Sequence, residues 1–300
     1  MSLSDAMGRF VPDGSAVAMG TCLESMIPFA AGHELIRQRR RDLTLIGPIS
    51  DILFDQLIAA GCVARIQAAW VGNVSAGLGH AYRRAAEQGL PRPIAIEDYS
   101  NYTISLALLA GAHGLPFFPS RSGPGSDIAR DHPGFADGVS PFDGEQVLCV
   151  RALRPDVAII AVQRADVEGS AHLWGNIGIS EEAGLAAERI IVLAEDIVDQ
   201  QVILSDPNRV LFPAFRVSAV VHCPGGCHPS PVQGYYRRDH ECYAEYHRES
   251  RTPEGTAAWL ERWVYDVADR AAYLERLGAE RWARLRQLRP AVAAPVDYAW

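Results

Sequence analysis

Residues 13–28 read DGSAVAMGTCLESMIP, and this stretch decides the fold. Asp13-Gly14 is a turn signal, and Val17-Ala18-Met19 is an apolar run of strand length. Gly20 follows where such a strand gives way to a loop and a helix, which is where open α/β sheets bind their ligands. Pro28 closes the loop. Taken alone, the stretch fits an ordinary strand–turn–helix as well as it fits a ligand-binding loop.

Apolar runs alternate with helical patterns along most of the chain. Strands are predicted over Ala16–Met19, Leu43–Ile46, Ala64–Trp70, Ile94–Glu97, Val147–Val150, Val157–Gln163, Ile190–Ala194 and Ala219–His222. Helices are predicted over Gly32–Gln38, Ile49–Ala60, His80–Gln88, Thr103–His113 and Ser180–Ala187. Wholly apolar strands between helices are typical of a parallel sheet covered on both faces. The fold class is therefore α/β, with a mainly parallel open sheet flanked by helices.

Two segments depart from this alternation. Residues 114–145 are rich in Gly, Pro and Asp, and we predict an ordered loop without regular elements. Residues 252–288 are amphipathic and predict a helical C-terminal extension. We therefore divide the chain into a main domain, residues 1–250, and an extension, residues 251–300.

The bulk composition limits the classes of function. A net charge of −8 disfavours nucleic acid as the main partner. There is no run of 18 apolar residues and no basic-then-apolar leader pattern, so we expect no membrane span and a cytoplasmic location. The six cysteines are scattered, mostly in apolar runs, which favours reduced thiols.

Several segments, in a consistent order, resemble the α subunit of the family I, glutaconate-type coenzyme A transferases. In the opening stretch the matching residues are Asp13, Gly14, Val17, Ala18, Met19, Gly20 and Pro28, whereas Thr21, Cys22 and Met26 depart from the family pattern. The further segments are PFAAGHELIRQRRRDLTLI (28–46), AWVGN (69–73), EDYSNY (97–102), GLPFFPSRSGPGSD (114–127), RPDVAIIAVQRADVEGSAHLWG (154–175) and PGGCHPSPVQGYY (224–236).

The resemblance implies an acyl-CoA:carboxylate CoA-transferase that shares its active site with a homologous β subunit, in an α2β2 assembly. A Glu carboxylate of β attacks the acyl-CoA thioester, and an enzyme-bound CoA thioester then passes CoA to a second acid. Coenzyme A thioesters are thus substrates, and no further cofactor is expected. The departures at Cys22 and Met26 hint at a larger or more apolar acyl group than a short dicarboxylate.

Glu97 is the best acidic candidate on this chain, ahead of Glu24, Glu34 and Asp98. It follows an apolar strand and sits at a carboxyl end, where ligands gather. The alternative is a salt-bridged or capping carboxylate. In a related branch, which resembles ring-opening hydrolases of bacterial steroid breakdown, the α chain carries a Glu near this segment. Alignment through the shared LPF-x-P element places Asn101 there.

The remaining candidates are substrate-binding residues. Gly20-Thr21 and Gly72-Asn73 end strands, where a glycine lets the backbone approach a ligand and an Asn amide can bind it. Ser100 and Asn101 could bind a carboxylate or an acyl oxygen, or cap the next helix. Arg121 could bind an anion bidentately, or pin its own loop.

Other chemistries lack support in the sequence. The His222/Cys223/Cys227/His228 cluster, with His240 and Cys242, fits no zinc spacing well, so we expect no metal site there. Neither G-x-G-x-x-G, nor the P-loop pattern, nor G-x-S-x-G occurs. Two alternatives to the transferase stay open: a hydrolase subunit of the same fold that opens a cyclic acyl-CoA, and a non-catalytic acyl-CoA binding module.

Overall fold

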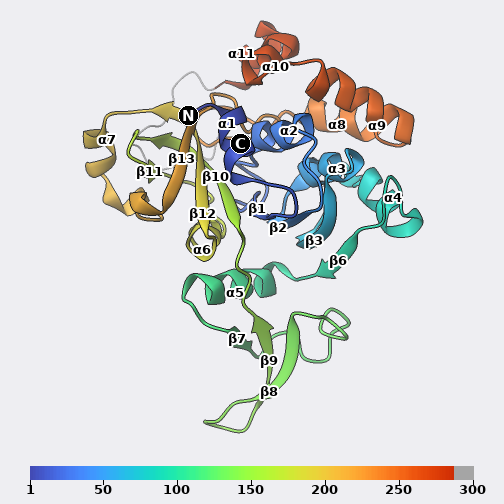
Figure 1. Ribbon diagram of the computed structural model, residues 1–300, viewed down its shortest axis with the longest axis vertical. Coiled ribbons are helices and arrows are strands. Elements are labelled where there is room, and N and C mark those ends of the chain that lie inside the picture. The colour runs from blue at the N-terminus through green and yellow to red at the C-terminus, as the bar shows by residue number, and fades with distance from the viewer. Residues whose placement is uncertain (287–300) are drawn as a thin grey trace.

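A computed structural model describes residues 1–286, built around a sheet of mainly parallel strands (Figure 1). Among the described residues the strand order is β13-β12-β10-β1-β2-β3-β6, and all neighbours in this order are parallel. The bounds are β1 (Ala16–Ala18), β2 (Leu43–Ile49), β3 (Val63–Trp70), β6 (Ala95–Asp98), β10 (Val157–Ala165), β12 (Arg189–Ile197) and β13 (Val217–His222). β11 (Ala171–His172) runs antiparallel to β10. The predicted α/β fold class is confirmed.

Helices cover both faces of this sheet, which is why its inner strands are largely apolar. Every residue of β10 is buried, whereas two of the four residues of the edge strand β6 are exposed. One face carries α1 (Leu3–Phe10), α2 (Phe29–Arg37), α3 (Asp51–Ala59) and α4 (His80–Gln88), and the other carries α5 (Asn101–Ala112) and α6 (Ser180–Ala186). The short helices α7 (Gln200–Leu204), η1 (Pro207–Arg209) and η2 (Ala214–Arg216) connect β12 to β13.

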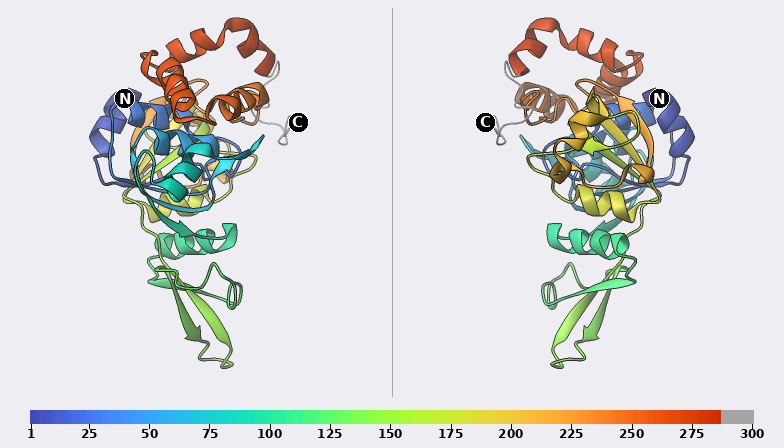
Figure 2. Two further views of the ribbon diagram at one scale, coloured as in Figure 1. Left: turned by 90° about the vertical axis from the view of Figure 1, so that its right-hand side faces the viewer. Right: turned by 90° about the vertical axis from the view of Figure 1, so that its left-hand side faces the viewer.

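The predicted loop over residues 114–145 is wrong in part, because it contains two strands. β7 (Phe117–Ser120) and β8 (Phe135–Val139) pair antiparallel with β9 (Gln146–Arg151), a strand that the sequence pattern predicts in the main sheet. Figure 2 shows this arm extending away from the body beyond α5. The strands escape prediction because they are largely exposed and lack alternation, and because β7 contains Pro119, which an edge strand tolerates.

The C-terminal helices form a further layer on the side of the sheet opposite α5 (Figure 2). They are α8 (His240–Glu249), α9 (Pro253–Leu260), the π-helical η3 (Glu261–Tyr265), α10 (Arg270–Leu277) and α11 (Ala279–Leu285). This confirms a helical C-terminal extension, although residues 287–300 lie outside the described part. Its apolar side chains join the same core cluster as the sheet. The division at residue 250 stays a prediction.

Within residues 1–286, none of the helices has the length and apolar character needed to cross a membrane.

His33 on α2 gives the fold a predicted sensitivity to acid. Burial, together with the charge of Arg270, lowers the pKa of His33 to about 3, and its Nε2 lies 2.9 Å from Gln56 Oε1. The imidazole therefore stays neutral in the folded chain but is protonated below pH 6.5 in the unfolded chain. Its contribution to stability is complete above pH 6.5 and is lost as the pH falls toward 3.

We expect His33→Gln to reduce the slope of unfolding free energy against pH by about 1 kcal/mol per pH unit between pH 6.5 and 5, approaching a limit of about 1.4 kcal/mol per pH unit near pH 5. Chemical denaturation at several pH values measures this slope. His113→Gln, at an exposed position, is the matched control and should leave the slope unchanged. A His33→Gln slope equal to that of the wild type would contradict the prediction.

Candidate active site

A cleft of about 640 Å³ opens at the carboxyl ends of the central strands. β1 and β10 are neighbours there, and the chain leaves them toward opposite edges of the sheet. Ligands of open α/β sheets bind at such a switch point. The cleft is lined by Leu23, Glu24, Ser25, Ile49, Gly175, Asn176, Ile177, Gly178 and Gln233.

The backbone around this cleft is held in conformations that most residues avoid. Leu23, Met26 and Asp51 have φ values of 61°, 53° and 55°, in the left-handed region where non-glycine residues are uncommon. Leu23 and Met26 lie in the loop after β1, and Asp51 follows β2. Such strain persists only where the surrounding structure enforces it, and it concentrates at functional sites.

Gly20 and Thr21 begin the loop after β1, just before the residues of this loop that line the cleft. Gly20 has a φ of 69°, and a Cβ at this position would lie 2.3 Å from Ser50 Oγ and 3.0 Å from Ser50 Cα. Thr21 is buried, with its Oγ1 2.7 Å from Ser180 Oγ. Both predicted residues therefore lie next to the cleft lining without being part of it, and the close approach at Gly20 leaves no room for a side chain.

Cys22, which departs from the family pattern, is a buried neutral thiol. Its Sγ lies 3.1 Å from Ser180 Oγ. Burial raises the pKa of Cys22 to about 11, more than the hydrogen bonds from Ser180 and Thr21 lower it. The thiol form therefore prevails at neutral pH, and the thiolate needed for nucleophilic attack is scarce.

Two distant loops close around the loop after β1. Asn176 Nδ2 donates to Cys22 O (3.1 Å), and Ile179 N donates to Thr21 O (2.9 Å). From the other side, Met26 N donates to Pro231 O (2.9 Å). Asn176 and Gln233 were not among the predicted site residues, although segment 224–236 resembles the family, because a polar residue in a loop carries no local pattern.

Gly72 and Asn73 do not line this cleft; they lie in the hairpin of β4 (Gly72–Asn73) and β5 (Gly77–Leu78). Asn73 is fully buried; its Nδ2 donates to Tyr243 O (2.9 Å) and its Oδ1 accepts from Ser75 N (3.0 Å). Both ends of the amide thus hold the fold together. A Cβ on Gly72 would meet the Trp70 ring at 2.5 Å. These contacts favour the structural alternative.

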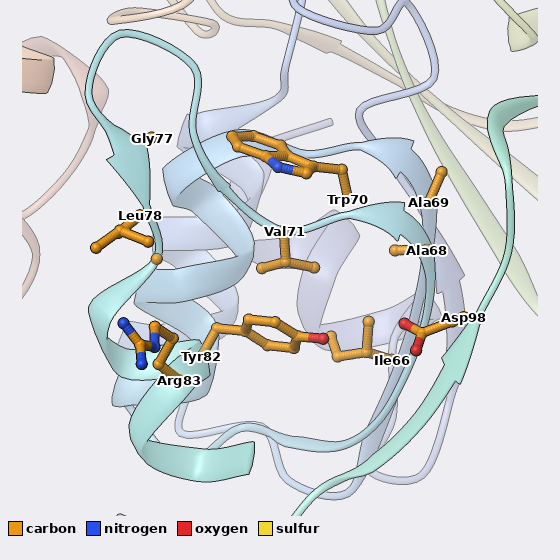
Figure 3. A pocket seen from close by; sticks show the side chains of 11 residues that line it. Ile66, Ala68, Ala69, Trp70, Val71, Gly77, Leu78, Tyr82, Arg83 and Asp98 are labelled. Atoms are coloured by element: carbon orange, nitrogen blue, oxygen red, sulfur yellow. The ribbon is translucent and has the colours of Figure 1, made fainter. Parts of the chain in front are cut away.

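A smaller pocket of about 310 Å³ lies beside this hairpin (Figure 3). It is lined by Ile66, Ala68, Ala69, Trp70, Val71, Gly77, Leu78, Gly79, Tyr82, Arg83 and Asp98. In Figure 3 the Tyr82 ring crosses the pocket with its hydroxyl directed toward Ile66 and Asp98. The pocket belongs to the edge of the sheet, next to β6, and not to the switch point.

Glu97 on β6 is engaged by its own neighbours on β3. Arg65 Nη1 and Gln67 Nε2 donate to its two carboxylate oxygens, the latter at 2.6 Å. Glu97 is thus not brought together with Gly20 and Thr21, because β6 is the edge strand and β1 lies at the centre. The contacts favour a salt-bridged carboxylate over a nucleophile.

We therefore expect Glu97→Gln to change the turnover of the assembled enzyme less than about threefold. The ion pair with half-exposed Arg65 contributes less than about 1 kcal/mol to stability, so the fold should survive its loss. Steady-state CoA exchange by the complex measures the effect. A variant that assembled normally but lost turnover would instead place the essential carboxylate on this chain.

Ser100, Asn101 and Arg121 also have partners within the fold. Ser100 is the N-cap of α5, its hydroxyl accepting from Thr103 N (3.0 Å) in a capping box. Asn101 begins that helix and is exposed. Arg121 lies at the end of β7 and pairs with Asp143 (2.9 Å) and Glu145 (2.7 Å) of the arm. None of the three reaches the switch-point cleft.

The cysteine and histidine cluster around residues 222–242 contains three buried thiols and one buried histidine. His228 is buried between Asp239 Oδ2 (2.9 Å from Nε2) and Tyr273 Oη (3.0 Å from Nδ1). Cys223, Cys227 and Cys242 are buried free thiols. In the described part of the chain, no group of three or more such side chains is arranged to hold a metal ion.

The fold, the switch-point cleft and the loop after β1 together define a class of protein. The family model for coenzyme A transferase matches residues 1–223, and the chain belongs to this family. It is 40% identical to one of the subunits of 3-oxoadipate CoA-transferase from Pseudomonas knackmussii, over 90% of this chain and 94% of that protein.

Solved and more distant relatives agree with this assignment. The structure of glutaconate coenzyme A-transferase from Acidaminococcus fermentans superimposes with a TM-score of 0.91 at 31% identity, covering 96% of this chain and 95% of that one. A cholesterol ring-cleaving hydrolase IpdA subunit of Rhodococcus jostii is 27% identical over 86% of this chain and 88% of its own. The predicted resemblance to the transferase α subunits is confirmed.

Proposed function

We propose that this chain is the α subunit of a heteromeric acyl-CoA:carboxylate CoA-transferase, and that a β subunit completes its active site. The observation that carries the proposal is the agreement with individual subunits of the 3-oxoadipate and glutaconate CoA-transferases over almost their whole length. An α2β2 assembly and a cytoplasmic location stay predictions.

The proposed division of labour places the nucleophilic Glu on β. Among the described residues that line the cleft, Glu24 alone has an ionisable side chain, and it contacts Arg238. On β, the attacking carboxylate would form an acyl anhydride and release CoA thiolate. The thiolate would then attack the carbonyl carbon of the enzyme carboxyl, forming the enzyme CoA thioester and freeing the first acid.

This chain would supply the shape of the acyl pocket. The cleft combines the apolar side chains of Leu23, Ile49 and Ile177 with the amides of Asn176 and Gln233. Such a mixture suits an acid that has an apolar segment and one or two polar groups. The fixed loop after β1 would orient the thioester for attack, since correct orientation lowers the barrier without new bonds.

The experiment begins with the tagged chain purified from its native cell together with the protein that co-purifies. The complex is incubated with an acyl-CoA and a ¹³C-labelled acid, and the label is followed by mass spectrometry. Labelled acyl-CoA supports the transferase. Consumption of a cyclic acyl-CoA without any acceptor acid supports the hydrolase. Binding without either reaction supports a non-catalytic module.

A second measurement locates the nucleophile. Peptide mass mapping of the complex after treatment with acyl-CoA should find CoA attached to a Glu of the partner. Attachment to a carboxylate of this chain would overturn the division of labour while leaving the transferase assignment intact. Light scattering of the same complex gives its stoichiometry, with α2β2 expected.

A further inference from the structure

A buried arginine lies directly beneath the switch-point cleft. Arg238 ends the loop that precedes α8, and its side chain is only 5% exposed. Its Nη2 donates to Glu24 O at 2.8 Å and lies 3.4 Å from Glu24 Oε2. Its Nη1 lies 3.6 Å from Asp51 Oδ2, and the guanidinium stands 5.3 Å from the centre of the Tyr243 ring.

These contacts join the two strained segments that border the cleft. Glu24 lies in the loop after β1, between the left-handed residues Leu23 and Met26. Asp51 follows β2, and its backbone also has a φ in the left-handed region. β1 and β2 are neighbours in the sheet, so one guanidinium reaches both loops.

The pair formed by Arg238 and Asp51 is costly to bury. Asp51 is fully buried, and its carboxyl interacts with the Tyr243 hydroxyl, whereas Arg238 Nη1 has no hydrogen-bond partner among the described residues. A buried ion pair with incomplete hydrogen bonding is a poor source of stability, and apolar or neutral replacements often match it. We therefore expect the ion pair between Arg238 and Asp51 to have a role in the site besides stabilising the fold.

We propose that Arg238 is a positioning residue for the CoA transfer reaction: it holds the carbonyl of Glu24 by a hydrogen bond and the carboxylate of Asp51 by an ion pair, and so sets the geometry of the loops that border the cleft. This inference rests on the proposed function. Arg238 touches no substrate in this scheme. It acts through the loop after β1, and its charge also lies close to the Glu24 carboxylate at the mouth of the cleft.

Two variants separate positioning from stability. Arg238→Met alone leaves Asp51 buried without a cation, and the complex should melt at a lower Tm. Arg238→Met combined with Asp51→Asn removes both charges, and Asn tolerates the left-handed conformation and can still accept from Val74 N, as Asp51 Oδ1 does at 3.0 Å. This double variant should recover most of the lost Tm.

The decisive readout is turnover in the complex with the partner subunit. We expect kcat to fall on the order of 100-fold in Arg238→Met, and to stay low in the double variant although Tm recovers. The exposed neighbour Arg237 supplies the matched control, Arg237→Met, which should keep wild-type kcat and Tm. A double variant that regained kcat along with Tm would reduce Arg238 to a structural role and overturn the proposal.

Amide hydrogen exchange keeps the test independent of the reaction. The Met26 amide, bonded to Pro231 O, should exchange faster in the double variant than in the wild type, even though their Tm values are similar. If the wild-type complex transferred no CoA, the proposed function would fail, yet this exchange rate would still report on positioning. Equal exchange rates would overturn the positioning role.

Discussion

Replacing Gly20 with alanine should lower the rate of CoA transfer at least about 100-fold. The new Cβ would lie 2.3 Å from Ser50 Oγ and 3.0 Å from Ser50 Cα, so the loops after β1 and β2 must separate. The same residue would also have to hold a φ of 69°, which costs on the order of 1–2 kcal/mol for an L-residue. A displacement of about 1 Å at reacting groups is enough for a loss of this size.

Gly14→Ala is the matched control for this prediction. Gly14 also has a positive φ, of 80°, but nothing lies within 4 Å of the position that its Cβ would take. The control therefore carries the backbone strain without the crowding at the cleft. We expect Gly14→Ala to lower the unfolding free energy modestly while retaining kcat. Equal losses of kcat in both variants would show that crowding against Ser50 is not the cause.

Replacing Trp259 with alanine should cost the chain about 3–5 kcal/mol of unfolding free energy. Trp259, on α9, is 2% exposed. Its ring packs against Tyr246 and Trp263, with centroids 5.2 and 5.7 Å away, and α9 contacts α3 of the main layer. Denaturant titration measures the change, and the transition should stay a single one because the core is continuous across residue 250.

Phe215→Ala provides the comparison for an exposed aromatic side chain. Phe215 is 85% exposed, so its truncation should change the unfolding free energy by less than about 0.5 kcal/mol. A second, separate transition in Trp259→Ala, with the first unshifted, would mean that the C-terminal helices unfold independently. That result would support the division of the chain at residue 250.

Local sequence patterns predict those helices and strands in which buried and exposed residues alternate with a fixed period or form a continuous apolar run. The helix predicted over His80–Gln88 has these bounds in the structure, and Gly61, just beyond α3, has the positive φ expected of a glycine after a helix end. Of the arm, β9 was predicted as a strand, whereas β8 escaped prediction because it contains Asp137-Gly138 and is largely exposed. The other strands of the arm are stabilised by pairing with β9, which no local pattern encodes.

For the candidate site too, local sequence patterns predict only those side chains whose position depends on the neighbouring residues in the chain. Gly20 could be placed at the cleft because it ends a strand, and position at a strand end is a local property. The side chains of Asn73 and Ser100 are able to bind a polar ligand, but in the structure both are hydrogen-bonded to backbone groups of the same chain. Arg238 reaches Glu24 across 214 residues of sequence, so only the three-dimensional arrangement reveals it.

The strand order also sets when the cleft can form during synthesis. β1 pairs on one side with β2, which follows soon after, but its other neighbour is β10, and Ala16 N donates to Asp156 across 140 residues. One edge of the central strand therefore stays open until more than half of the chain has left the ribosome. Contacts between such distant segments form slowly, because a long loop must close first. The nascent chain thus carries an unpaired apolar strand edge, the feature that favours aggregation, at the place where the cleft will later stand.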